Sequence, residues 1–460
     1  MNKALLVDQL RNASHPSVLH KIAQQVKNLH PADLAEILNE LSISQTLLIL
    51  SRLGSHHRAM VFSHFSDTRQ DNLLQQMSRE VMAALFRHLP SDVRADIYNR
   101  MNDRIRRDLL SALPKAQRED MLRMSLHPEG TTGSEMSSDF ITVSAEMTVG
   151  QALKHIRSTA SEKETIYVIY VLDNQGGLNG TVSLREMLVA SDELMMKEIM
   201  RPDPVSVKVD LPKEQAAELI RHYNLLALPV LNDEGKMLGI MTMDDAMDIE
   251  KEQDVRQLAR FGGTTLGETS DLDIMTSPFH QMFRVRVFWL ALLTVFGVIA
   301  SNFVAAQEEI LSEIVILAAF LAPVIDMGGN TGSQSATLVI RGMALGEIKM
   351  KWRYVWLVIR RELPVVMGLG LVIALLEVAL AQFSKGVGVD IMLVVGLSML
   401  VCTILGGIIG ALLPFVARRI GTDPATLSSP LITSIMDLLG VFIYFGFSWL
   451  LLGDLLTQAG

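Results

Sequence analysis

The sequence predicts a membrane protein of several domains: an all-α N-terminal domain, an α/β tandem repeat, a connecting helix and a domain of five transmembrane helices. Three observations indicate this fold class. The composition of the 460-residue chain changes after about Pro278, where alternating charged and apolar residues give way to long apolar runs. Five of these runs reach the roughly 20 residues needed to cross a bilayer. Upstream of the change, a pattern of helix, strand, Gly turn and strand occurs twice. The expected domains are 1–130, 131–249, 250–280 and 281–460.

The composition argues against several classes of function. A net charge of −9 and a pI near 5.7 leave no basic stripe to neutralise the phosphates of a nucleic acid. The Gly-rich run at 328–332 lacks the Lys of a phosphate-binding loop, and no motif for nucleotide hydrolysis is evident, so we do not expect an enzyme. The one cysteine, Cys402, lies in an apolar run and supports neither a disulfide nor a thiolate metal site.

About 280 residues precede the first apolar run, and we expect them to stay in the cytoplasm because the N-terminus lacks the apolar segment of a cleaved signal peptide. Residues 15–125 carry apolar side chains at helical spacing, for example in 32–41. Asp92 and Asp96 stand one turn apart at the predicted start of a helix, with Ser91 as the expected N-cap. Such carboxylates often just complement the helix dipole, which is the alternative to a functional role.

The α/β segment is an internal repeat. Residues 151–157 parallel 215–221, and 171–180 parallel 230–239. Each copy predicts a helix, an apolar strand, a tight Gly turn and a second strand. Two such copies are expected to pack as a pseudo-symmetric pair around a shared core.

An acidic helix is predicted after the second copy, running to about Arg260. Its acidic residues between 244 and 254, where Lys251 is the one base, are Asp244, Asp245, Asp248, Glu250, Glu252 and Asp254. Such a run is usually a solvated helix face. Here it connects the repeat to the first membrane span, and divalent cations would relieve the repulsion between its carboxylates. We therefore expect cation binding to change how this helix sits against the pore.

The five predicted spans are 286–306, 313–340, 355–382, 390–416 and 427–452. Basic residues gather in the loops on one side of them: Arg284, Arg286, Arg341, Lys349, Lys351, Arg353, Arg418 and Arg419. Because positive charge is retained on the cytoplasmic side, the N-terminus is predicted inside and the C-terminus outside the cell.

Two of the spans carry polar residues at a spacing of four, which places each set on one helix face. The sets are Asp326, Asn330 and Gln334 in the second span, and Ser429, Thr433 and Asp437 in the fifth. A carboxylate costs roughly several kcal/mol in hydrocarbon, so each set should face water, a cation or a partner. The alternative for Asp437 is a bond to the backbone of a neighbouring helix. Together the two sets indicate a shared path lined by oxygen atoms.

The chemistry of this path predicts its ion. All its side chains offer carboxylate, amide or hydroxyl oxygens, which hard cations such as Mg²⁺, Mn²⁺ and Ca²⁺ prefer, whereas the His and Cys expected for zinc or copper are missing. Mg²⁺ gives up its water reluctantly and suits a site with few carboxylates. The oxygen set alone does not separate Mg²⁺ from Mn²⁺, Co²⁺ or Ca²⁺.

The most specific motifs are Gly-Gly-Asn-Thr-Gly-Ser-Gln at 328–334, Asp-Pro-Ala at 423–425, and Ser-Pro-Leu-Ile-Thr at 429–433 followed by Asp437. In this order they resemble the bacterial MgtE magnesium transporter/channel family, and the resemblance covers nearly the whole chain. It implies an N domain of helices, a tandem pair of CBS domains, a connecting (plug) helix and a five-helix pore domain. It also implies a homodimer with the pore on its two-fold axis, in the bacterial inner membrane.

The resemblance assigns roles to individual residues. Asp437 matches the pore carboxylate that holds hydrated Mg²⁺, and Asp423 matches an acidic position at the cytoplasmic mouth. Asn330 and Thr433 would line the same path. The regulatory Mg²⁺ ligands would be Asp92, Asp96, Asp245, Asp248, Glu250 and Asp254. Plentiful intracellular Mg²⁺ would bridge these domains and close the pore. The acidic helix is a few residues shorter than expected, with Gln253 at an acidic position, and Ser91 stands where an Asp often does.

Some CBS domains bind adenine nucleotides through a Gly-x-x-Thr-x-x-Asp element, which Gly239, Thr242 and Asp245 fit. ATP is therefore a second expected ligand, although a CBS pair without nucleotide is an equal alternative. Asp245 cannot bind ATP and Mg²⁺ independently of each other.

Three functions remain open from the sequence. The first is a passive, gated Mg²⁺ channel. The second is a transporter that couples a divalent cation to protons or Na⁺, with Asp437 or Asp326 as a titrating relay. The third is a membrane-tethered nucleotide sensor whose spans merely anchor it.

Overall fold

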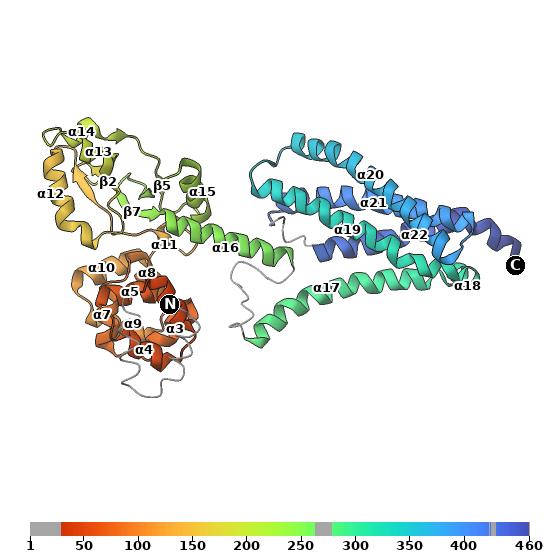
Figure 1. Cartoon of the computed structure of the whole chain (residues 1–460), viewed down its shortest axis with the longest axis horizontal. Coiled ribbons are helices and arrows are strands. Elements are labelled where there is room, and N and C mark those ends of the chain that lie inside the picture. Colours follow the sequence, from red (N-terminus) through yellow and green to blue (C-terminus); the bar gives the residue numbers. More distant parts are fainter. Residues whose placement is uncertain (1–28, 263–277, 423, 425–428, 460) are drawn as a thin grey trace. The chain divides into compact units, whose positions relative to one another are not determined.

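The computed structural model describes residues 29–262, 278–422, 424 and 429–459. The chain forms two compact units, the first ending at Lys251 and the second beginning at Glu252 (Figure 1). The first unit contains the short N-terminal helices and the strands of the repeat, and the second contains the long apolar helices.

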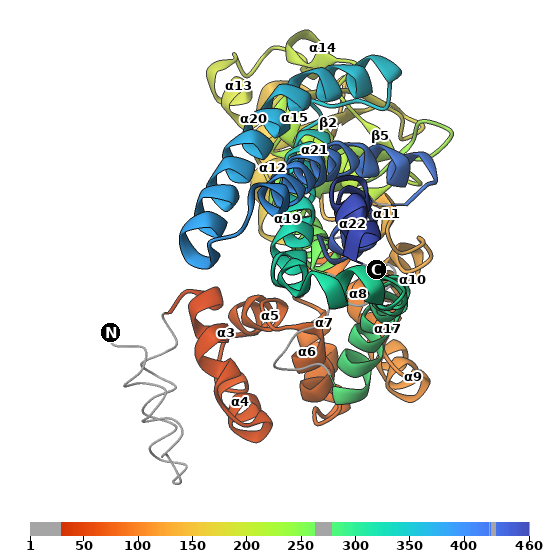
Figure 2. The same cartoon turned by 90° about the vertical axis from the view of Figure 1, so that its right-hand side faces the viewer.

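The N-terminal part of the first unit is a stack of short helices, each of 8 to 10 residues (Figure 2). They are α3 (Pro31–Asn39), α4 (Ile43–Leu50), α5 (Ser55–Ser63), α6 (Asp67–Leu74), α7 (Arg79–Phe86), α8 (Ser91–Arg100), α9 (Asp103–Ala112) and α10 (Lys115–Met124). Side chains define several starts: Ser42 and Gln45 form a capping box, and Asn102 accepts from the amide of Ile105. Phe62 and Phe86 lie in one apolar core. The predicted all-α N domain is confirmed.

The repeat folds as two small sheets that share the same arrangement of three strands, with a fourth strand added to the first sheet. The first has the order β1 (Thr142–Ser144), β2 (Val168–Leu172), β3 (Leu178–Ser183) and β4 (Arg201–Pro202); the second has β5 (Val207–Lys208), β6 (Ala227–Leu231) and β7 (Met237–Thr242). In both, the first pair is parallel and the second antiparallel. The pair Val171–Gly180 in one sheet corresponds to Val230–Gly239 in the other, and a bulge follows each. This is the predicted pair of copies.

Helices accompany these strands, and one core joins the two copies. The helices are α11 (Thr132–Glu135), α12 (Val149–Thr159), α13 (Leu184–Val189), α14 (Met196–Ile199) and α15 (Lys213–Tyr223), with a 3-10 turn, η1 (Ala160–Glu162). Tyr170 from the first sheet packs with Ala227 and Ile240 from the second, and all three are buried. The ring of Phe140 meets Tyr170 edge to face at 5.9 Å.

The acidic helix α16 (Met243–Phe261) begins directly after β7 and is continuous over 19 residues. The expected domain boundary at 250 falls inside this helix. Ala246 and Ile249 are buried in the core of the second copy of the repeat, while Asp244, Asp248 and Asp254 are exposed. These three carboxylates thus lie on the solvent side of a helix whose first half is anchored by apolar contacts.

In the second unit, the described residues include five helices long and apolar enough to cross a membrane. They are α17 (Phe279–Ala305), α19 (Ala318–Ala344), α20 (Trp352–Lys385), α21 (Val389–Arg419) and α22 (Ser429–Ala459). A short helix, α18 (Glu308–Glu313), and a 3-10 turn, η2 (Val315–Leu317), lead into α19. The predicted number of spans is confirmed.

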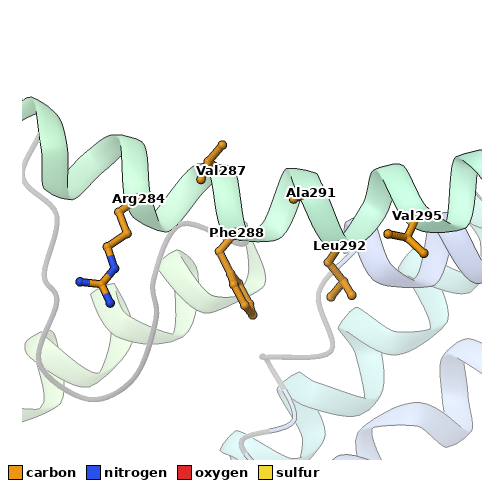
Figure 3. Close-up of a pocket in the computed structure, with 6 residues that line it drawn as sticks. All are labelled: Arg284, Val287, Phe288, Ala291, Leu292 and Val295. Atoms are coloured by element: carbon orange, nitrogen blue, oxygen red, sulfur yellow. The ribbon is translucent and has the colours of Figure 1, made fainter.

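The helix α17 has an uncovered apolar side, shown in Figure 3 with Arg284 at its start and Phe288, Leu292 and Val295 further along. These side chains are exposed within the single chain. A basic residue followed along the helix by an apolar face is typical of a membrane helix that enters the bilayer from the cytoplasmic side.

Glycines let α19 and α21 pack backbone against backbone. A Cβ atom on Gly406 would lie 2.1 Å from the carbonyl oxygen of Gly328, and one on Gly410 would lie 2.0 Å from that of Gly332. Both helices therefore present two glycines four residues apart to each other, the spacing that allows close approach in membranes. No larger residue fits at these positions without moving a helix.

We expect Gly410→Ala to lower the stability of the membrane domain by roughly 1–3 kcal/mol, since overpacking a close contact forces the helices apart. The fraction of detergent-solubilised protein that remains monodisperse after heating measures this. Gly297→Ala in α17 is the matched control, because nothing lies within 4 Å of the added carbon. If Gly410→Ala and Gly297→Ala kept the same monodisperse fraction after heating, the close contact between α19 and α21 would be contradicted.

Candidate ion path and candidate cation sensor

The polar set on α19 lies along one exposed face of that helix. Asp326, Asn330 and Gln334 are all exposed or partly exposed, whereas Gly328 and Gly332 on other sides are buried against neighbouring helices. The bundle of the single chain thus leaves a polar strip in a membrane helix open. The sequence-based placement of these three side chains on one face is borne out.

The helix α22 brings its own polar set beside this strip. A Cβ atom on Gly329 would lie 3.2 Å from the Cα atom of Thr433, and one on Gly440 would lie 3.1 Å from Ile325 Cγ1. These two close contacts fix an antiparallel register between α19 and α22. In this register the carboxylates of Asp326 and Asp437 are near enough to interact electrostatically.

The described oxygens of this path come from Asp326, Asn330, Gln334, Thr433 and Asp437, on two helices. Thr433 and Asp437 are partly buried. The Ser429 side chain and all of Asp423 fall outside the described residues, so their roles stay predictions. No group of three or more His, Cys, Asp or Glu side chains within the described ranges is placed to hold a metal ion. Two carboxylates flanked by amides and hydroxyls suit an ion that keeps much of its water.

A second acidic site lies in the cytosolic unit. Asp92 in the first turn of α8 lies near enough to be repelled by Asp245 in the first turn of α16 and by Glu164 from the segment before β2. Burial, followed by repulsion from Asp245 and then Glu164, raises the pKa of Asp92 well above its ordinary value. Asp92 Oδ1 is inaccessible to solvent and has no hydrogen-bond partner among the described residues.

The partners of Asp92 are shifted in the same direction. Burial raises the pKa of Asp245 to about 6, against the hydrogen bonds that it accepts from Thr242. Partial burial, together with repulsion from Asp245 and Asp244, raises the pKa of Glu164, although this residue keeps contact with solvent. Burial and repulsion thus make the charged form of each of these carboxylates costly, although no three acidic side chains of the described residues are placed to hold a metal ion together.

Sequence reasoning missed Glu164. It lies outside the acidic helix and the N domain, and a backbone bond from its amide to the carbonyl of Asp139 (2.8 Å) holds its segment in place. No local pattern marks it, because its proximity to Asp92 and Asp245 arises from the tertiary fold.

The remaining predicted sensor residues have separate surroundings. Asp96 forms an ion pair with Arg100 at 3.2 Å, and Glu250 pairs with Arg221 at 2.8 Å. Asp248 and Asp254 are exposed on α16. The structure therefore brings together Asp92 and Asp245 from the predicted set and leaves the others as single surface carboxylates or ion pairs.

Contacts between the N domain and the repeat position Asp92. The buried Ser91 hydroxyl lies 2.9 Å from that of Ser137 and accepts a bond from the amide of Ser138 at 2.8 Å. Arg94 adds ion pairs to Asp120 (3.3 Å) and Asp139 (3.7 Å). The prediction of Ser91 as N-cap is wrong: Pro90 is the N-cap and Ser91 is the first helical residue, because its hydroxyl is used between the domains.

The proposed nucleotide element lies at the junction of β7 and α16. The Thr242 amide and hydroxyl both donate to Asp245 Oδ2, at 3.0 and 2.6 Å, so this carboxylate closes the first turn of α16. A Cβ atom on Gly239 would lie 2.8 Å from the carbonyl oxygen of Ser137. Gly239 is thus required by contact with a neighbouring strand segment, whatever the element binds.

Comparisons with known proteins agree with this architecture. Residues 321–447 match the family model described as a divalent cation transporter, and 29–130 match the MgtE intracellular N domain. Residues 134–193 and 196–252 each match the CBS domain.

Curated relatives cover most of the chain. The magnesium transporter MgtE of Thermus thermophilus is 31% identical over 455 residues, which span 97% of this chain and 98% of the relative. That of Enterococcus faecalis is 31% identical over 326 residues, spanning 70% of this chain and 69% of the relative. A crystal structure of the cytosolic domain of the Mg²⁺ channel MgtE in complex with ATP is 30% identical, with a TM-score of 0.50, over 53% of this chain and 99% of that structure.

Five membrane helices among the described residues, an intracellular helical domain and a CBS pair define a multi-pass divalent cation transporter with cytoplasmic domains. Within that class, the chain belongs to the MgtE family, since a relative 31% identical extends along 97% of its length. The resemblance in the sequence motifs is thereby confirmed.

The raised pKa values predict how pH changes the stability of the cytosolic unit. Where the pH lies between the ordinary and the raised pKa, the folded state binds more protons than the unfolded state, so stability falls as pH rises. For Asp245 this interval extends from 3.8 to about 6. In Mg²⁺-free buffer we expect the thermal midpoint of the cytosolic transition to fall across it.

Asp92→Asn should flatten this dependence and raise the midpoint at pH 7.5, because it removes one of the repelling charges. Glu234→Gln, which changes an exposed carboxylate paired with Lys236, should leave the dependence intact. An unchanged pH profile in Asp92→Asn would contradict the buried cluster.

Proposed function

We propose that the chain is a Mg²⁺-selective channel that takes up magnesium down the membrane potential and closes when cytoplasmic Mg²⁺ binds its acidic sensor. The observation that carries this proposal is the pair of polar strips on α19 and α22, with Asp326 and Asp437 in electrostatic contact between membrane helices. The potential alone is a sufficient source of energy, because a divalent ion gains about 4.6 kcal/mol per 100 mV, twice the single-charge value. The names of the relatives support magnesium as the ion.

A homodimer would complete the path. The strip of Asp326, Asn330 and Gln334 is open in the single chain, and an ionised or amide side chain is costly against hydrocarbon. A second copy facing this strip would enclose it and supply the same oxygens again. The proposed pore therefore lies between two copies, with Asp437 holding hydrated Mg²⁺ and Asn330 and Thr433 lining its approach.

The sensor would work by charge neutralisation. Mg²⁺ bound between the carboxylates of Asp92 and Asp245 would hold the N domain, the CBS pair and the start of α16 together. Without Mg²⁺, repulsion would favour their separation and an open pore. The exposed Asp248 and Asp254, and Glu250 with Asp96, are the further proposed ligands on these surfaces. Asp423 would be the acidic residue at the cytoplasmic mouth.

ATP is proposed as a second regulator. The Gly239–Thr242–Asp245 element fits the ribose contact of CBS domains, and a relative's cytosolic domain has been crystallised in complex with ATP. The protein would lie in the bacterial cell membrane with its C-terminus outside, as the basic loops predict.

One observation favours a second candidate function, a proton- or Na⁺-coupled transporter. Asp326 and Asp437 lie near enough to interact between membrane helices, and carboxylates inside membrane helices are common members of proton relays. This candidate requires that uptake stop when the proton and Na⁺ gradients are removed.

We expect Asp437→Ala to reduce Mg²⁺ flux into liposomes to the level of protein-free vesicles, because the proposed pore loses the carboxylate that holds the hydrated ion. Size-exclusion chromatography checks that the variant stays folded and keeps its oligomeric state. Asp390→Ala, at the exposed start of α21, is the matched control and should keep wild-type flux. Wild-type Mg²⁺ flux in Asp437→Ala would contradict the assignment of Asp437 to the pore.

Millimolar Mg²⁺ should slow proteolysis of the full chain between residues 92 and 254 several-fold, since ion binding would join the domains that carry these residues. NaCl at matched ionic strength serves as the control. Asp245→Asn should weaken the protection. Equal protection by NaCl would count against ion bridging.

A further inference from the structure

A carboxylate on α20 reaches across to the helix that carries half of the proposed path. The hydroxyl of Ser335 on α19 donates to Glu362 Oε1 over 2.6 Å, a length typical of a hydroxyl bonded to a carboxylate. Ser335 is 2% exposed and Glu362 is partly buried. A carboxylate in this position is costly in a membrane helix and needs a reason.

The absence of a side chain at Gly407 in α21 leaves room for this bond. A Cβ atom on Gly407 would lie 2.2 Å from Val366 Cγ1 and 3.3 Å from Ser335 Oγ. Any side chain at 407 would therefore collide with α20 and crowd the hydroxyl on α19. Since α20 otherwise packs chiefly on α21 and touches α19 little, the bond through this gap is a specific link between α19 and α20.

Ser335 directly follows Gln334 in α19, so the two side chains point about 100° apart at nearly the same depth in the membrane. Ser335 faces inward to Glu362, and Gln334 lies on the open polar strip. Rotation of α19 about its axis would move both. The bond to Glu362 thus opposes any rotation that would turn Gln334 and Asn330 away from the path.

We propose that Glu362 is a positioning residue for ion selection: by holding Ser335 it fixes the rotation of α19 and the placement of Asn330 and Gln334 along the path. The inference rests on the proposed function, because it assumes that this strip lines the ion's route. Its chemistry requires a hydrogen-bond acceptor at 362 and does not require the negative charge itself.

The test measures Mg²⁺ and Ca²⁺ flux separately in liposomes containing the full-length protein. Glu362→Ala and Ser335→Ala should each reduce the preference for Mg²⁺ over Ca²⁺ by roughly tenfold, the effect of losing one hydrogen bond to a charged group. The double variant should be no worse than either single variant, since both remove the same bond. Glu362→Gln should retain the wild-type preference, because its amide oxygen can accept the same bond.

Thr403→Val is the control, an isosteric loss of a buried hydroxyl that bonds to Met399 within its own helix; its flux ratio should equal that of the wild type. A role in folding alone would lower the yield of protein without changing the flux ratio. Wild-type selectivity in both alanine variants would overturn the proposal, and so would equal loss in Glu362→Gln and Glu362→Ala. Failure of the proposed function gives a distinct result: Mg²⁺ flux would then be the same in Asp437→Ala as in the wild type.

Discussion

Repulsion between carboxylates that the fold forces together is the constraint on which both candidate sites depend. In the membrane unit, Asp326 and Asp437 interact across two helices. In the cytosolic unit, Asp92 is repelled by Asp245 and Glu164. Each arrangement costs free energy when no cation is present, and a divalent ion at the proposed sites would reduce that cost. Repulsion between carboxylates would therefore contribute to ion selection in the membrane unit and to ion sensing in the cytosolic unit.

Helix packing by glycine determines where the carboxylates of the membrane unit lie. Close contact of Gly328 and Gly332 with α21 sets the position of α19, and Gly329 sets its register against α22. The bond from Ser335 to Glu362 then links α19 to α20. Small residues thus determine the geometry, while the polar side chains supply the chemistry.

The sequence allowed the polar strips to be predicted because a spacing of four is a local property of a helix. The repeat was predictable for the same reason, since its two copies share strand and turn patterns. Glu164 and Glu362 escaped prediction because their partners lie far away in the sequence. Ser91 was misassigned as a cap because its hydroxyl bonds to Ser137 and Ser138 of another domain, which helix-start rules do not consider.

The most direct test of the account is a liposome assay with the full chain that applies a membrane potential without proton or Na⁺ gradients. Flux of Mg²⁺, Mn²⁺, Co²⁺ and Ca²⁺ is measured while Mg²⁺ on the side of the cytosolic domains is varied. For a Mg²⁺-gated channel, we expect Mg²⁺ to pass preferentially and its flux to fall as Mg²⁺ on that side rises into the millimolar range. Flux that requires a proton or Na⁺ gradient, or that does not depend on Mg²⁺ at the side of the cytosolic domains, would contradict the proposed gated channel.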